Sequence, residues 1–313
     1  MKKFLKFLFR CAVPFLIYFS VENAVYLASA LLPPEAWDAP EFPMILTGVT
    51  DLVTIPVLWA LYRADGIRGV RPADRSRETG VPRLLLSAVS FAGIYFAVNM
   101  MLNVFDIVGT DAAFQEVSDS IESASPGLQL LVAGIIGPVA EELLFRGLLM
   151  RRTEKALGPL RAMLLSALMF GAFHGNLTQG IAAAVLGICL GIACLCTDSL
   201  LVPVLMHAAA NSAAVLVSLP AMEEVMESDV VFLAIPCFSA LSAGVFLSMY
   251  AAPFRRLLKN WRERKLRRTA AVVEWPAEAP GGEEAETGFP PAEAPAEFKM
   301  DTASGTPKGP DER

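Results

Sequence analysis

The sequence has only two histidines, and charged residues make up 19% of its 313 positions, below the roughly 25% usual for soluble domains. Hydrophobic residues make up 54%, with 22 glycines in addition. They are gathered in blocks of about 20 residues, the length that crosses a bilayer. These features exclude a soluble globular domain. They predict an all-α fold, a polytopic transmembrane helix bundle.

Cysteine is sparse, and no CxxC pair occurs. The five cysteines all lie in apolar runs, at Cys11, Cys189, Cys194, Cys196 and Cys237. This pattern argues against a zinc–thiolate site, a redox motif and a disulfide scaffold. We expect buried, apolar thiols.

The net charge of −6 comes from the C-terminal end of the chain. Residues 269–313 hold ten acidic and three basic residues and are rich in Pro, Ala and Glu, so we predict a disordered acidic tail. The rest of the chain is close to neutral. It shows no basic face with interleaved aromatics, so we expect no nucleic-acid partner.

The apolar blocks predict about eight transmembrane spans. Their approximate limits are 11–32, 43–62, 83–108, 127–150, 159–175, 178–197, 201–220 and 231–254. The first block is too long for a signal peptide and is interrupted by Glu22 and Asn23, so we favour an uncleaved anchor over a cleaved signal. The crowded region 159–220 leaves room for a short or re-entrant helix.

Basic residues alternate between successive loops, which predicts that both termini are cytoplasmic. Lys and Arg are concentrated at the N-terminus, in the 63–83 loop, after residue 150 and in segment 255–268, whereas loops 33–42, 109–126 and 221–229 contain acids and no base. Segment 255–268 has eight bases and one acid. It could be an amphipathic helix on the anionic inner leaflet or an ordinary stop-transfer flank.

Four regions follow from this organisation. They are the N-terminal helices with their basic loop (1–82), a core (83–220), the last span with its basic flank (221–268) and the acidic tail (269–313).

Ionisable side chains inside a membrane are costly, so each one is a functional candidate. The 127–150 span contains Glu141, Glu142 and Arg146. Glu142 and Arg146 are four residues apart and share a helix face, where an ion pair would partly offset their desolvation. Glu141 has no obvious local partner. The alternative is that both carboxylates already lie among the headgroups at a cytoplasmic helix end.

Both histidines of the chain lie in apolar spans, His174 in MFGAFHGN and His207 in PVLMHAAAN. Asn211 follows His207 by four residues and shares its face. Gly187 and Gly191 form a GxxxG in the preceding span, which predicts a helix-packing face. Carboxylate, imidazole and amide groups in one membrane region suit water activation and oxyanion binding. The same groups could bind a divalent metal.

Three blocks now stand out: Glu141-Glu142-x-x-x-Arg146, Phe170-x-x-x-His174 and His207-x-x-x-Asn211. In this order they resemble the motifs of the CPBP intramembrane proteases, which include the type II CAAX prenyl endopeptidases and bacteriocin-processing enzymes. The resemblance covers about residues 83–220, the region that we therefore assign as the protease core.

The resemblance implies a role for each motif residue. Glu141 and His174 would activate the attacking water, and His207 and Asn211 would stabilise the oxyanion. Glu142 and Arg146 would orient these groups, with Phe170 packed beside His174. A divalent metal such as zinc could be held by Glu141, His174 and His207, although a metal-free glutamate mechanism fits the same residues. No HExxH, GxGD or GxSG motif points to another class of intramembrane protease.

One geometric difficulty remains. On ideal helices, His174 lies about 20 Å above the cytoplasmic start of its span, whereas Glu142 lies only about 12–14 Å above the Arg151–Arg152 flank. A tilted or broken 159–175 helix would be needed to bring them level.

Four further polar residues interrupt apolar spans, Glu22, Asn23, Asp51 and Asn99. They could line a substrate path. We favour the alternative, that they are buried and form hydrogen bonds between helices.

The sequence therefore predicts a membrane endopeptidase acting on a peptide or a membrane-anchored protein, with the lipid bilayer as its surroundings. We expect a multi-pass protein of the bacterial inner membrane. A catalytically inactive scaffold or chaperone of the same fold is the alternative. A proton-coupled transporter is less favoured, because the polar motifs occupy one half of the chain and no inverted repeat is visible.

Overall fold

The computed structural model describes residues 2–69 and 79–273. The chain divides into two units, Met1–Arg268 and Thr269–Arg313. Every regular element in the described ranges is a helix, which confirms the all-α prediction. Residues 274–313, most of the predicted acidic tail, and residues 70–78 of the predicted basic loop lie outside the described residues.

Among the described residues, six helices are long and apolar enough to cross a membrane, so the chain is a multi-pass membrane protein. Five are α1 (Lys2–Ser29), α2 (Phe42–Ile67), α3 (Val81–Val104), α10 (Leu177–Thr197) and α13 (Asp229–Val273). The sixth runs from Pro126 to Leu157. It is composed of α6 (Pro126–Leu131), η3 (Val132–Ile136), α7 (Gly137–Glu142), η4 (Leu143–Met150) and α8 (Arg151–Leu157).

Two of the eight predicted spans are shorter. Helix α9 (Pro159–Phe173) has 15 residues, about 22 Å against a hydrocarbon core of about 30 Å. Helix α11 (Leu201–Val217) has 17 residues and is followed by a 77° bend into Pro220–Met226. The expected short helix in the 159–220 region is thus present. The span count of eight and the orientation of the termini remain predictions.

Small residues bring α9 and α10 into close contact. A Cβ on Gly187 would lie 3.2 Å from Ala167, and one on Gly191 would clash with Met163. These two glycines are therefore the predicted packing face, because a side chain at either position would push the helices apart.

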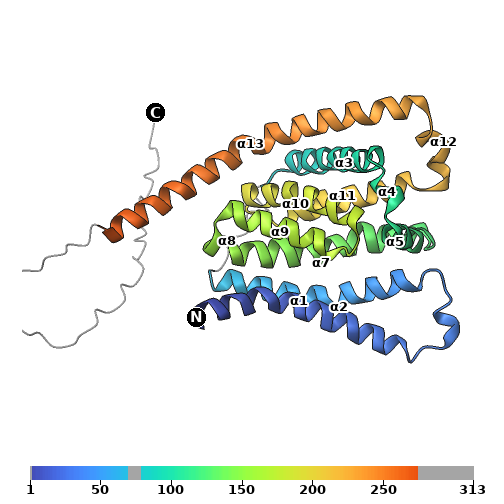
Figure 1. Cartoon of the computed structure of the whole chain (residues 1–313), viewed down its shortest axis with the longest axis horizontal. Helices are drawn as coiled ribbons and strands as arrows, with labels where there is room; N and C mark the ends of the chain where they lie inside the picture. The colour runs from blue at the N-terminus through green and yellow to red at the C-terminus, as the bar shows by residue number, and fades with distance from the viewer. Residues whose placement is uncertain (1, 70–78, 274–313) are drawn as a thin grey trace, which may run out of the picture. The chain divides into compact units, whose positions relative to one another are not determined.

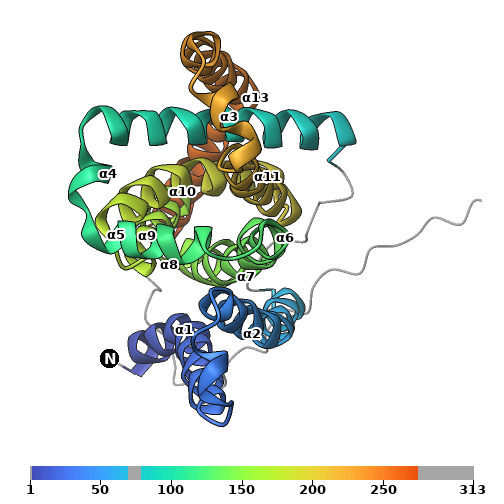
Figure 2. The same ribbon diagram turned by 90° about the vertical axis from the view of Figure 1, so that its right-hand side faces the viewer.

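The other long helices lie on two sides of this centre. Figures 1 and 2 show α1 and α2 as a pair beside α7, with α3 and α13 on the opposite side. A hydrogen bond of 2.7 Å between the hydroxyls of Ser87 and Tyr250 joins α3 to α13. The composite helix that carries the Glu-Glu-x-x-x-Arg block thus lies between the α1–α2 pair and the α9–α10 pair.

Short helices complete the described chain. They are η1 (Pro34–Ala36), α4 (Ile107–Thr110), α5 (Ala112–Glu122), η5 (Pro220–Met222) and α12 (Glu223–Met226). The last predicted span and its basic flank form one helix, α13, in which Trp261 packs on Gly158. All five cysteines are free, but Cys237 is exposed on α13, so burial was a wrong prediction for that thiol. Its position on a predicted span explains the exposure, because an apolar thiol there can face lipid.

Arg151 and Arg152, predicted to mark a cytoplasmic turn, are in fact buried within α8. Arg152 Nε lies 2.5 Å from Asp65 Oδ2, and Arg10 Nη2 lies 3.3 Å from the other oxygen of Asp65. Arg151 bonds Asp198 at 3.1 Å. These long cationic side chains can be buried because Asp65 of α2 and Asp198 at the end of α10 neutralise them.

Candidate active site

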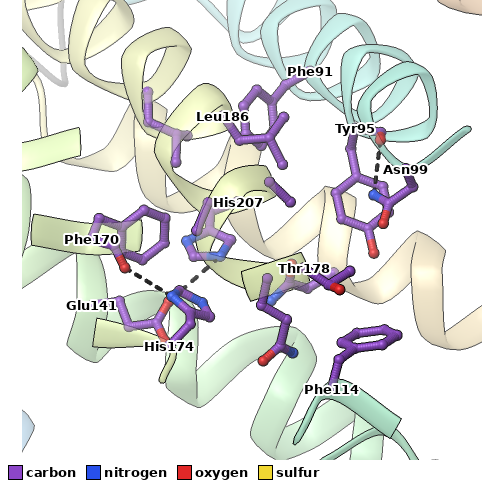
Figure 3. A pocket seen from close by; sticks show the side chains of 15 residues that line it. Phe91, Tyr95, Asn99, Phe114, Glu141, Phe170, His174, Thr178, Leu186 and His207 are labelled. Carbon is purple, nitrogen blue, oxygen red and sulfur yellow. Dashed lines mark hydrogen bonds and ion pairs between the residues drawn. The ribbon is translucent and has the colours of Figure 1, made fainter. Parts of the chain in front are cut away.

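A cavity of about 180 Å³ contains the centre of the site. Glu141, His174, His207 and Asn211 all line it, as the labelled side chains in Figure 3 illustrate for the first three. Glu142 and Arg146 do not line it and are completely buried behind it. The structure therefore brings residues from three separate motif blocks to one place.

The depths of Glu142 and His174 agree because the chain turns later than the sequence suggested. The helix that carries Glu142 continues past Arg151 and ends at Leu157, and α9 begins at Pro159. Glu142 lies 15 residues before Leu157, and His174 lies 15 residues after Pro159. Because the two helices are antiparallel and each site residue lies 15 residues from the turn, Glu142 and His174 lie at the same height, and no broken helix is needed.

Two π-helical stretches flank the Glu-Glu pair. η3 ends just before α7, and η4 follows Glu142 directly. A π-turn changes which side chains face a given neighbour and is frequent at functional sites. All eight residues of η4 are buried. The side chains of Glu141 and Glu142 consequently have different surroundings, the first 22% exposed and the second fully enclosed.

His207 connects the two glutamates. Its Nδ1 lies 3.1 Å from Glu142 Oε1, and its Nε2 lies 3.6 Å from Glu141 Oε2. Both ring nitrogens thus face a carboxyl oxygen. Glu141, which has no obvious partner nearby in the sequence, is therefore paired with the imidazole of His207 on α11.

The His174 ring has a defined orientation. Its Nδ1 lies 2.8 Å from the carbonyl oxygen of Phe170. A carbonyl can only accept, so Nδ1 carries the proton and Nε2 is left as the acceptor. The His174 ring also packs edge-on against the Phe170 ring, with centroids 4.9 Å apart. The contact implied between Phe170 and His174 is present.

Phe170 also packs against two other motif side chains, Arg146 and His207. The guanidinium of Arg146 lies over its ring at 4.4 Å, and the His207 ring is 5.6 Å away. Because it contacts all three, its ring fixes the spacing between the two histidines and the buried cation.

The predicted ion pair is formed, with Arg146 Nη1 donating to Glu142 Oε1 at 2.7 Å. Arg146 Nη2 donates to the carbonyl oxygen of Gly187 at 3.2 Å. Both side chains have zero exposure. Two ions without water require each other and further hydrogen bonds, so this pair holds η4 against α10 and holds Glu142 toward His207.

Asn211 donates from Nδ2 to the carbonyl oxygen of Ala133, at 3.0 Å. The amide nitrogen carries two N–H groups, so one remains to donate elsewhere. Ala133 belongs to η3. The bond orients the Asn211 amide at the wall of the cavity.

The donor set offers little to a metal ion in this arrangement. Among the residues that the structure describes, no group of three or more His, Cys, Asp or Glu side chains is close enough to hold one. The candidate ligands Glu141, His174 and His207 line one cavity. However, each ring nitrogen of His207 already faces a carboxyl oxygen.

Comparison with known proteins supplies the family. Residues 123–213 match the model for the Rce1-like type II CAAX prenyl endopeptidases. This segment is therefore similar to the type II CAAX prenyl endopeptidases, as the three motif blocks predicted. No curated protein and no solved structure matches the chain.

The matched segment 123–213 contains all six predicted site residues, but other residues that line the cavity lie outside it. Phe91, Tyr95 and Asn99 of α3 and Phe114 of α5 line the cavity. The Nδ2 of Asn99 donates within α3 to the Tyr95 carbonyl, so the favoured hydrogen bond between helices was a wrong prediction for this residue. The sequence could not identify the aromatic residues as part of the site, because the pattern of an apolar span does not show whether an aromatic side chain faces lipid or a cavity.

The other intramembrane polar residues have mixed outcomes. Glu22 and Asn23 are exposed on α1, so burial was a wrong prediction for them. Asn23 satisfies its amide on the carbonyl oxygen of Phe19 in its own helix, which allows it to face outward. Asp51 is buried and accepts a hydrogen bond from Tyr18 on another helix, as we favoured.

Asp111, which lies outside the matched segment, is hydrogen-bonded to two residues that line the cavity. Asp111 caps α5 by accepting from the Phe114 amide at 3.2 Å. Its other oxygen accepts from the amide and the hydroxyl of Thr178, at 2.7 and 2.8 Å. Phe114 and Thr178 both line the cavity. We define this set of contacts as the Asp111 latch.

The latch should open in acid. Hydrogen bonds from Thr178 and Phe114 hold the pKa of Asp111 below its ordinary value of 3.8, so the latch is complete at neutral pH and is lost as pH falls through that lowered pKa. We expect Asp111→Ala to lower the protection of the Phe114 and Thr178 amides against exchange at pH 7. Wild type should lose the same protection only when the pH falls below the lowered pKa of Asp111, on the acid side of 3.8. Hydrogen exchange read by mass spectrometry checks this.

Asp119→Ala, an exposed acid in the same α5 helix, is the matched control and should leave exchange unchanged. Equal protection in wild type and Asp111→Ala at pH 7 would contradict the latch.

Proposed function

We propose that this chain is an intramembrane endopeptidase that hydrolyses a peptide bond with water activated by glutamate and histidine. The observation that carries the proposal is the shared cavity of Glu141, His174, His207 and Asn211, in a chain that has six described helices long and apolar enough to span a membrane. The match of residues 123–213 to the type II CAAX endopeptidases supports the same reaction class.

The proposed chemistry begins with a water molecule between Glu141 and His174. Glu141 accepts one proton of the water as general base, and His174 accepts a hydrogen bond from the other at Nε2. The hydroxide equivalent attacks the carbonyl carbon of the substrate. Glu141 then returns its proton to the nitrogen of the leaving amine as the C–N bond breaks.

The oxyanion is assigned to His207 and Asn211. As an imidazolium, His207 would donate toward both glutamates, and Glu141, Glu142, Arg146 and His207 would together carry no net charge, which favours burial in an apolar region. When the proton from water reaches Glu141, Nε2 of His207 becomes free to donate to the oxyanion. The second N–H of Asn211 adds another donor.

The same geometry favours a route without a metal. His207 faces carboxyl oxygens on both sides, so it would have to turn away from one glutamate to become a ligand. We therefore propose the glutamate-type mechanism over the metalloprotease mechanism. The presence of all six motif residues favours a peptidase over a scaffold, because a scaffold needs none of the hydrogen bonds that orient His174 and Asn211.

The substrate is proposed to be a peptide segment of a membrane-associated protein, which reaches the cavity from within the bilayer. The proposed location is the bacterial inner membrane.

The proposal predicts new protein termini that depend on Glu141. We expect membranes from cells with the wild-type chain to contain cleaved termini that disappear with Glu141→Gln, because the amide cannot accept the proton of water. Quantitative mass spectrometry of membrane-protein termini checks this. Glu116→Gln, an exposed residue on α5, is the control. Identical termini with wild type and Glu141→Gln would overturn the proposed function.

A further inference from the structure

We propose that Tyr18 and Asp51 are positioning residues that hold Glu141 and His174 in their working geometry. They belong to α1 and α2, outside the segment that matches the family. This inference rests on the proposed peptidase function and extends its site to the N-terminal pair of helices.

Tyr18 and Asp51 form a hydrogen bond between two helices. The Tyr18 hydroxyl donates to Asp51 Oδ1 at 3.0 Å. Tyr18 is 8% exposed and Asp51 is 3% exposed. In the described part of the chain, no Lys, Arg or His forms an ion pair with Asp51. The phenol is therefore the group that satisfies and orients this buried carboxyl.

Asp51 lies against the helix turn that precedes Glu141. A Cβ built on Gly137 would be 3.7 Å from Asp51 Oδ2. Gly137 is the first residue of α7, and Glu141 is four residues later on the same face. The carboxyl of Asp51 thus lies beside the first turn of the helix that carries the proposed general base. A shift of Asp51 would change the position of that turn.

The ring of Tyr18 supports the second catalytic group. It packs edge-on against Phe173 with centroids 5.2 Å apart. Phe173 is the last residue of α9 and immediately precedes His174. Phe173 also contacts Phe145 of η4, at 5.4 Å. One side chain of α1 therefore touches the supports of both Glu141 and His174, the hydroxyl through Asp51 and the ring through Phe173.

These two contacts can be separated by mutation. Tyr18→Phe keeps the ring on Phe173 and removes only the hydrogen bond. Asp51→Asn keeps an oxygen that can accept from Tyr18, whereas Asp51→Ala removes the acceptor. A displacement of about 1 Å in a catalytic group can lower the rate about 100-fold. If Tyr18 and Asp51 are positioning residues, Tyr18→Phe and Asp51→Ala should therefore lower the turnover, whereas Asp51→Asn should keep most of it.

The experiment measures kcat and KM of the purified full chain in detergent. The substrate is a peptide that spans a cleavage site identified by the mass spectrometry of membrane-protein termini described above. We expect Tyr18→Phe and Asp51→Ala to lower kcat about 10- to 100-fold with little change in KM, and Asp51→Asn to restore most of the loss. Tyr26→Phe, on the same helix but 59% exposed, should behave as wild type. Rates are divided by the folded fraction, measured by thermal unfolding, so that a purely structural defect does not count.

The inference is overturned if corrected kcat in Tyr18→Phe equals that of wild type, or if Asp51→Asn loses as much as Asp51→Ala. These outcomes differ from failure of the proposed function, in which the wild-type chain cleaves no peptide or Glu141→Gln retains full turnover.

Discussion

Glu141→Gln is expected to lower kcat for peptide hydrolysis by about 10²- to 10⁴-fold, the contribution typical of a general base. Glutamine has the same shape, so the cavity and the contact with His207 should persist. The amide oxygen, however, cannot take the proton of the attacking water. Because the substrate still occupies the same cavity, KM should change little. Steady-state kinetics on purified protein in detergent provide the measurement.

Chelation separates this mechanism from a metal-dependent one. Glu116→Gln should retain wild-type kinetics, and wild-type enzyme treated with chelator and shown to be free of metal should keep its turnover. Loss of turnover on chelation, with recovery on adding zinc, would reject the glutamate-type mechanism while leaving the peptidase function in place. Full turnover in Glu141→Gln would reject Glu141 as the base.

Arg146→Ala is expected to destabilise the fold by about 3–5 kcal/mol, the usual cost of breaking a buried ion pair. The variant leaves the carboxylate of Glu142 enclosed without its bond of 2.7 Å to Arg146. It also removes the guanidinium that lies over Phe170 and bonds the Gly187 carbonyl. Thermal unfolding in detergent, followed by circular dichroism, should show a clearly lower Tm.

Arg63→Ala, an exposed arginine on α2, is the matched control and should keep the wild-type Tm. The double variant Glu142→Gln with Arg146→Met should recover part of the lost stability, because it leaves no unpaired charge. It should stay inactive, since His207 then lacks the carboxylate at Nδ1. An Arg146→Ala variant as stable as Arg63→Ala would show that the pair does not support the fold.

Many features of the site could be predicted from the sequence because they depend on short spacings. Glu142 and Arg146 pair because residues four apart share a helix face, and Gly187 and Gly191 pack because small residues allow close approach. Intramembrane ionisable groups are also conspicuous against an apolar background. These signals are sufficient to predict Glu141, His174 and His207 as candidate site residues from the sequence.

Other features of the site depend on the residue at which a helix ends, and hydropathy does not predict that residue well. Arg151 and Arg152 looked like a cytoplasmic flank, but Asp65 and Asp198 neutralise them, so the helix continues to Leu157. Neither acid is near the arginines in sequence. The predicted difference in depth between Glu142 and His174 arose because the turn was placed at Arg151 and Arg152, whereas the helix ends at Leu157.

The sequence by itself determined the helical class, the membrane setting and the identity of the polar residues, because apolar runs and spacings of three or four residues are local properties. Only the tertiary structure decided that His207 lies between Glu141 and Glu142, that His174 presents Nε2 and that Tyr18 contacts Asp51. Each of these contacts joins different helices or requires a fixed ring orientation. Their formation depends on helix register, on the π-helical stretches beside the glutamates and on close packing at glycine, which arise when the whole bundle assembles.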